Sequence, residues 1–145
     1  MTSDALPGPF SDRLGYLLKH AHLRYTEVST RALAPLGTDG RELAVLAVLA
    51  SDTPLSQQEA AGRLGVDRTT MVALVDALEA KSLAERLRSP TDRRKNIVRL
   101  TEQGRQLLDR AERTRLRTER DFLAALPAPD ARILLSALRV LATGD

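Results

Sequence analysis

Three consecutive cations, Arg93, Arg94 and Lys95, lie between two short segments that have the character of β-strands. The segments are AERLR (84–88) and NIVRL (96–100). The tip that joins them, counted from Ser89 to Asn96 with the first residue of the second segment included, is longer than the two residues that close many hairpins. A long basic tip suits contact with a polyanion, because clustered cations strengthen the local attraction for negative charge.

One acid and one proline interrupt this run of cations. Asp92 precedes Arg94 by two residues, and we expect its carboxylate to pair with the Arg94 guanidinium and fix its direction. Pro90 would stiffen the approach, and Arg88 adds a cation at the end of the first strand. An arginine at such a tip can enter the minor groove of DNA, where the potential is negative. The alternative is an ordinary charged loop that faces solvent.

The positive charge of the chain is concentrated in this region. The 145 residues carry a net charge of only +3, but the segment from Ala84 to Arg105 contains seven cations and three acids. A basic patch on a nearly neutral protein favours one surface that faces nucleic acid.

Two helices are expected directly before the hairpin. In SQQEAAGRLGV, Ser56 and Glu59 fit a capping box at the start, and Gly65 suits a left-handed residue at the end. Asp67 can cap the next helix, RTTMVALVDALEAKSL. A short helix joined through a glycine turn to a capped helix is typical of the helix-turn-helix motif, and the hairpin makes it a winged one.

The start of the second helix is the candidate element for the major groove of DNA, where base edges present a distinct pattern of donors and acceptors. Its first residues, Arg68, Thr69 and Thr70, would face bases and backbone. The two threonines have an alternative role, since threonine also satisfies backbone groups at helix ends. The preceding helix would bind phosphates through its first turn. The residues expected to do so are Ser56, Gln57 and Gln58.

Helices are expected over most of the remaining chain, so the predicted fold class is mainly α with a small β-hairpin. The residues expected to begin these helices are Ser11, Asp39 with Glu42 as a capping box, Thr101, and Pro129 in a first turn. The helix from Thr101 should run to about Leu126. Because aromatic residues make up 3% of the chain, the core must consist of Leu, Val and Ala.

The segment from Leu55 to Gly104 closely resembles the winged-helix core of the multiple-antibiotic-resistance regulator (MarR) family. The resemblance rests on LS…EAAGRLGV, DRTTM…LVDALEAKSL and DRR…IVRLTEQG. It implies a transcription regulator, most often a repressor, that binds a pseudo-palindromic operator as a homodimer. It also implies that each wing carries Asp92 and Arg94 to the minor groove, and that a small, often aromatic or phenolic, molecule releases the DNA.

The resemblance further implies one continuous domain with two regions. Residues 1–36 and 102–145 would form a helical dimerisation region, and residues 38–101 the DNA-binding winged helix. The chain departs from the family pattern at Ala73 and Ala77, where relatives often carry arginine on the recognition helix. Ser82 replaces a usual glycine, and a left-handed turn there would cost serine more than glycine. The absence of cysteine excludes the peroxide-sensing branch of the family.

Tyr16 and His20 are the candidate residues for a small-molecule site, because they lie four residues apart and share a helix face. Three of the four aromatic residues lie between Phe10 and Tyr25. The alternative is that these side chains pack in a dimer interface. His20 and His22, the two histidines, would point to nearly opposite sides and cannot chelate one metal. Neither a metal nor a cofactor is expected.

Several classes of protein are disfavoured by the sequence. Without cysteine there is no disulfide or thiolate site, and the N-terminus lacks the order of a signal peptide. The longest apolar run, LAVLAVLA, is too short to span a membrane, so a soluble cytoplasmic protein with no membrane partner is expected. No catalytic cluster is present, so an enzyme is not expected. Two alternatives to a ligand-responsive repressor stay open, a winged-helix module that binds another protein and a constitutive DNA binder.

Overall fold

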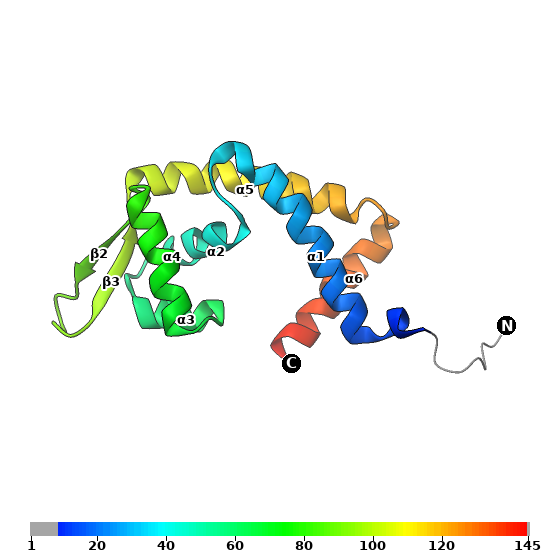
Figure 1. Cartoon of the computed structure of the whole chain (residues 1–145), viewed down its shortest axis with the longest axis horizontal. Coiled ribbons are helices and arrows are strands. Elements are labelled where there is room, and N and C mark those ends of the chain that lie inside the picture. Colours follow the sequence, from blue (N-terminus) through cyan, green and yellow to red (C-terminus); the bar gives the residue numbers. More distant parts are fainter. Residues whose placement is uncertain (1–8, 145) are drawn as a thin grey trace. The chain divides into compact units, whose positions relative to one another are not determined.

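The computed structural model of the protein describes residues 9–144. In chain order the elements are η1 (Phe10–Asp12), α1 (Leu14–Leu33), η2 (Ala34–Leu36), α2 (Gly40–Leu49), β1 (Leu55–Ser56), α3 (Gln57–Leu64), α4 (Arg68–Ala80), β2 (Ala84–Arg88), β3 (Asn96–Leu100), α5 (Glu102–Leu123) and α6 (Ala128–Thr143) (Figure 1). This order confirms the predicted fold class, a mainly helical winged helix-turn-helix with a small β-sheet.

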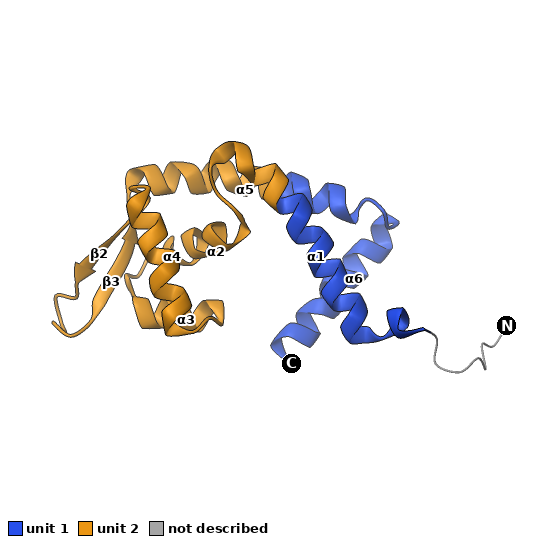
Figure 2. Ribbon diagram, viewed as in Figure 1, with its two compact units in different colours: residues 1–29, 116–145 blue, residues 30–115 orange. Residues whose placement is uncertain are grey.

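The chain divides into two compact units (Figure 2). The winged-helix unit comprises residues 30–115, and the helical unit comprises the residues up to 29 and from 116 onward. Helices α1 and α5 each contribute residues to both units.

The wing is the hairpin of β2 and β3, and both strands have the bounds that the sequence predicts. In the hairpin Arg88 lies opposite Asn96. β3 is the central strand, because it also pairs antiparallel with β1, where Leu55 lies opposite Val98. Val98 and Leu100 are buried, as the alternation along β3 requires. The two-residue strand β1 was not expected from the sequence.

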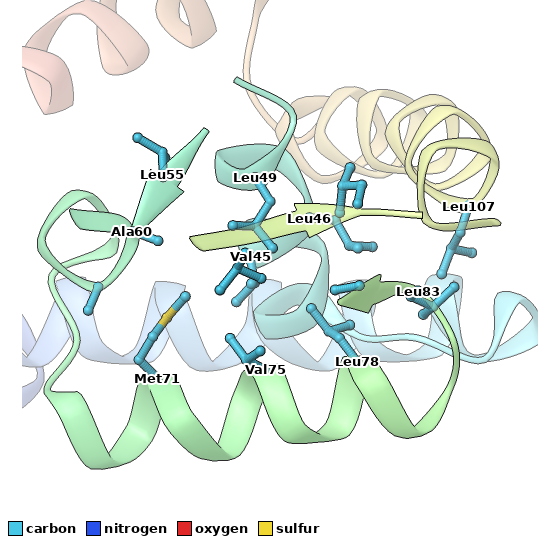
Figure 3. Close-up of a cluster of buried hydrophobic side chains, with 14 residues drawn as sticks. Val45, Leu46, Leu49, Leu55, Ala60, Met71, Val75, Leu78, Leu83 and Leu107 are labelled. Carbon is cyan, nitrogen blue, oxygen red and sulfur yellow. The ribbon is translucent and has the colours of Figure 1, made fainter. Parts of the chain in front are cut away.

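The core of the winged-helix unit is aliphatic, as the low aromatic content predicts. Figure 3 shows side chains of α2 and α4 packed against the sheet, among them Val45, Leu46, Met71, Val75 and Leu78. All five are fully buried. Burying one such side chain stabilises a fold by roughly 1.5–3 kcal/mol. This packing fixes α4 to the sheet that carries the wing.

The helix-turn-helix uses the predicted capping residues. The Ser56 hydroxyl accepts a hydrogen bond from the Glu59 N–H at 3.0 Å, and the Glu59 carboxylate accepts one from the Ser56 N–H at 3.1 Å. α3 ends at Gly65, whose φ of 68° is left-handed. The Asp67 carboxylate then accepts from the Thr70 N–H at 2.7 Å and begins α4. The turn between the helices is therefore determined by local contacts.

Half of the capping box predicted for α2 forms. The Asp39 side chain accepts from the Glu42 N–H at 2.9 Å, but the Glu42 carboxylate turns elsewhere. Glu42 is buried, and it accepts from Lys81 Nζ at 2.8 Å and from the Thr38 hydroxyl at 3.0 Å. Lys81 also donates to the Gly37 carbonyl at 2.9 Å. A buried carboxylate is stable only when it is paired, so Lys81 ties the end of α4 to the start of α2.

The turn after α4 is left-handed at Ser82, whose φ is 62°. Within residues 9–144 it is the one non-glycine residue with positive φ. Thr101 caps α5 as predicted, because its hydroxyl accepts from the Gly104 N–H at 3.0 Å and donates to the Ser82 carbonyl at 2.6 Å. A Cβ atom on Gly104 would overlap the Leu83 carbonyl oxygen. α5 therefore crosses this turn at a distance that only glycine allows.

The predicted cap at Ser11 is wrong, because α1 begins at Leu14. Ser11 lies instead inside the short helix η1. The Asp12 N–H donates to the Pro9 carbonyl at 2.8 Å, and this turn places Ser11 before the helix can start. Arg13 is extended and separates η1 from α1.

The long helix α5 stops three residues before the expected end, at Leu123. The Leu126 N–H donates to the Leu123 carbonyl at 2.9 Å in a tight turn, and Pro127 has no N–H with which to continue a helix. Pro129 lies in the first turn of α6, as predicted.

Large apolar side chains of the helical unit face outward. Phe10, Leu14, Ile133 and Leu141 are each 65–67% exposed, and none of the residues described in α6 is buried. An apolar surface of this kind marks a site of contact with another surface. No helix within residues 9–144 combines the length and apolar character needed to cross a membrane.

Candidate nucleic-acid interface

A cleft of about 410 Å³ lies between the wing and the helix-turn-helix. Six residues that the sequence singled out line it, namely Ser56, Gln57, Gln58, Arg68, Arg94 and Lys95. They come from the start of α3, the start of α4 and the tip between β2 and β3. Elements distant in sequence thus place hydroxyl, amide and cationic groups around one concave surface.

The other predicted DNA-binding residues lie outside the lining of this cleft. Thr69 is exposed and Thr70 is half-buried in the first turn of α4. Arg88 and Arg93 are exposed, and Asp92 is half-buried in the tip. Across residues 9–144 the structure contains no ion pair of Arg68, Arg88, Arg93, Arg94 or Lys95. The wing and the start of α4 therefore present cations that form no ion pair within the described residues.

Hydrogen bonds within the tip give it a defined shape. The Ser89 N–H donates to the Lys95 carbonyl at 3.0 Å, which closes the loop. The Ser89 hydroxyl accepts from the N–H groups of Thr91 and Asp92, each at 3.3 Å. The Asp92 carboxylate accepts from the Arg94 N–H at 3.0 Å.

The expected pair between the Asp92 carboxylate and the Arg94 guanidinium is not formed. A short aspartate side chain reaches the backbone N–H two residues on more readily than a long and mobile guanidinium, and it closes an Asx turn. Asp92 therefore shapes the backbone of the tip and leaves the Arg94 guanidinium exposed.

Two cations of the basic segment are neutralised within the chain. The Arg86 guanidinium pairs with Asp76 at 2.7 Å and with Glu79, and its side chain is 21% exposed. Arg99 pairs with Glu85 at 2.5 Å across the hairpin. The positive charge available to a polyanion is therefore smaller than the sequence count suggested, and it lies at the tip. Sequence reasoning did not assign a separate role to Arg86.

Two carboxylates at the helix starts have lowered pKa values. The Ser56 N–H holds the pKa of Glu59 below its ordinary value, and the Ser56 hydroxyl and the charge of Lys95 act in the same direction. The Thr70 N–H lowers the pKa of Asp67. Both carboxylates are therefore ionised at neutral pH.

The two candidate ligand residues lie together in the helical unit. The Tyr16 and His20 rings are stacked, with centroids 3.9 Å apart. Phe10 meets Tyr16 edge-on at 5.8 Å, and the Arg13 guanidinium lies 4.9 Å from the Phe10 centroid. The described residues contain no group of three or more side chains suited to hold a metal ion.

Comparisons with known proteins agree with this geometry. Residues 36–95 match the family described as the MarR family. The HTH-type transcriptional repressor NicR of Pseudomonas putida is 33% identical over 106 residues, which cover 73% of this chain and 67% of that protein.

Two solved structures are similar over nearly the whole chain. The transcriptional repressor CouR bound to a 23-mer DNA duplex is 36% identical, with a TM-score of 0.87 and 98% of each chain covered. CouR from Rhodococcus jostii RHA1 bound to p-coumaroyl-CoA is 28% identical, with a TM-score of 0.79 and coverage of 92% of this chain and 94% of that one. Members of this family are regulators and not enzymes. The chain belongs to the MarR family of DNA-binding transcription regulators.

Proposed function

We propose that the protein is a homodimeric repressor that binds a pseudo-palindromic operator and is released by a small aromatic or phenolic ligand. The observation that carries the DNA-binding site is the cleft flanked by unpaired cations of α4 and the wing tip. The similar repressor CouR binds a DNA duplex, which supports the same role here.

α4 would enter the major groove, with Arg68, Thr69 and Thr70 near bases and backbone. The first turn of α3 would bind phosphates through Ser56, Gln57 and Gln58. The wing would contact the flanking minor groove. Its proposed contacts are Arg88, Arg93, Arg94 and Lys95, with Asp92 shaping the tip.

The exposed apolar surface of the helical unit supports the homodimer. Leu14, Leu17, Ile133 and Leu141 are each more than half exposed, although they lie on helices with a regular apolar pattern. A second copy of the chain would cover them and create an interface of the apolar kind found in permanent dimers. We assign this role to residues 1–36 and 102–145, and DNA binding to residues 38–101.

The proposal includes a response to a small-molecule ligand. The stacked Tyr16 and His20 rings offer an aromatic surface on which a planar ligand can pack. CouR from Rhodococcus jostii binds p-coumaroyl-CoA, which contains a phenolic ring. A ligand that prefers one separation of the two recognition helices would shift the dimer away from the DNA-binding state. Repression of this kind would take place in the cytoplasm.

Selection of bound fragments from a random duplex pool tests the proposal. The purified protein should enrich a pseudo-palindrome whose half-sites lie about 10 base pairs apart, one turn of DNA. Mass measurement in solution should give two chains per duplex. If the protein enriches no sequence and shows no binding to duplex DNA at low salt, it would instead be a protein-binding module. A thermal-shift screen with phenolic acids distinguishes a ligand-responsive repressor from a constitutive binder.

A further inference from the structure

We propose that Arg86 is a positioning residue that presents the Gln57 amide to a DNA phosphate. This inference rests on the proposed DNA-binding function and assigns Arg86 a role in it. The claim is that the Arg86 guanidinium fixes Gln57 and does not itself touch DNA.

The Arg86 guanidinium is held by two helices, α3 and α4. Its Nε donates to Gln57 Oε1 of α3 at 3.0 Å. One terminal nitrogen donates to Asp76 at 2.7 Å and to Glu79, and the other donates to the Val72 carbonyl at 3.2 Å, all in α4. Arg86 itself belongs to β2, so one side chain joins the wing to both helices of the helix-turn-helix.

These contacts determine which end of the Gln57 amide faces Arg86. A guanidinium carries only donors, so the amide atom 3.0 Å from Arg86 Nε must be the oxygen. The amide nitrogen is then directed away from Arg86. Gln57 lines the cleft together with Arg94 and Lys95. Within residues 9–144 the Gln57 amide nitrogen donates no hydrogen bond, so its two N–H groups are available to an anion.

The charge around Arg86 argues against direct phosphate binding. Asp76 and Glu79 both pair with it, and its side chain is 21% exposed, whereas Arg94 is exposed and pairs with no acid in the described chain. A phosphate would have to compete with two carboxylates for Arg86. Gln57, which Arg86 holds and which lines the cleft, offers its amide N–H groups without such competition.

A double-mutant cycle on the full-length protein tests the proposal. The probe is the duplex that the wild-type protein selects from a random pool. Gln57→Ala removes the donor, and Arg86→Lys keeps the charge but loses the planar array of donors that holds the amide. Each should weaken binding by about tenfold, and the double variant should be weakened by about tenfold in total, because both changes remove the same contact. A double variant weakened by about a hundredfold, the product of the two effects, would overturn the proposal.

Three further measurements separate positioning from folding and from direct contact. Arg99→Lys, the matched change at the other arginine–carboxylate pair of the hairpin, should leave affinity unchanged. The slope of log affinity against log salt should stay at the wild-type value in Arg86→Lys and Gln57→Ala, since no phosphate contact made by a cation is lost. An Arg86→Met variant that lowers the slope by about 0.9 would show that Arg86 contacts a phosphate.

If Arg86→Lys unfolds, Gln57→Glu still tests the claim. This variant keeps an acceptor for Arg86 and replaces the amide donor with a carboxylate. The melting temperature should therefore stay at the wild-type value, while DNA affinity should fall by more than tenfold. Wild-type affinity in Gln57→Glu would overturn the proposal. If the wild-type protein binds no duplex, the proposed DNA-binding function itself is wrong. That outcome is distinct from a failure of the role assigned to Arg86.

Discussion

The carboxylate of Asp92 accepts a hydrogen bond from the backbone N–H of Arg94 at 3.0 Å. This contact determines the backbone at the tip of the wing and leaves the Arg94 side chain unpaired. The acid therefore serves the basic tip by shaping it and not by holding the guanidinium.

Asp92→Ala should weaken operator binding by about 1 kcal/mol relative to Asp92→Asn, because asparagine keeps the acceptor for the Arg94 N–H. Both variants lose the same negative charge, so Asp92→Asn is the matched control. Fluorescence anisotropy titrations with a labelled duplex measure the difference. Equal affinities in the two variants would show that the Asx turn at Asp92 does not contribute to DNA binding.

Ser82→Gly should raise the free energy of unfolding by about 1 kcal/mol, because a non-glycine residue at φ 62° carries a steric cost that glycine avoids. Urea denaturation at fixed protein concentration measures the gain. Gly65→Ala tests the reverse case. The φ of Gly65 is 68°, and a Cβ atom there would meet no neighbour. Gly65→Ala should therefore lower the free energy of unfolding through the cost of the backbone conformation alone. A Ser82→Gly variant with unchanged stability would contradict this reasoning.

Gly104→Ala should destabilise the protein by about 1–3 kcal/mol or prevent folding, because the added Cβ would overlap the Leu83 carbonyl oxygen. Gly62→Ala in α3 is the control, since nothing lies within 4 Å of a Cβ there and alanine is the better helix former. Thermal unfolding compares the two. Similar melting temperatures in both variants would show that α5 can move away from the turn.

Acid should weaken the helix-turn-helix through Glu59 and Asp67. Their pKa values in the folded chain lie below the ordinary values of 4.5 and 3.8. The unfolded chain therefore binds more protons, and this part of the stability is complete above the ordinary values and is lost as pH falls through the folded values. Denaturation between about pH 6 and pH 3 should give a steeper loss for the wild type than for a Glu59→Gln, Asp67→Asn double variant. Parallel curves would exclude these two groups as the source.

The helix-turn-helix was predictable because its signals are local. Ser56, Glu59, Gly65 and Asp67 each begin or end a helix within a few residues, so their roles do not depend on the rest of the fold. The bounds of β2 and β3 followed from two five-residue segments of strand character on either side of a polar tip.

The features that the sequence did not predict depend on residues that are distant in the chain, or on which of two nearby groups accepts or donates a hydrogen bond. β1 exists because Leu55 meets Val98, and two residues alone give no strand pattern. The partners of Arg86 come from α3 and α4, and no spacing in the sequence connects them. For Asp92 the spacing allowed either the guanidinium or the backbone N–H of Arg94. The shorter reach favours the backbone.

The most direct test of the account is the salt dependence of operator binding by wild type and Arg94→Ala. If the Arg94 guanidinium enters a DNA groove, the variant should bind about 1–3 kcal/mol more weakly, with a log–log salt slope smaller by about 1. An affinity and a salt slope equal to those of the wild type would contradict the central claim that the wing tip binds in a DNA groove.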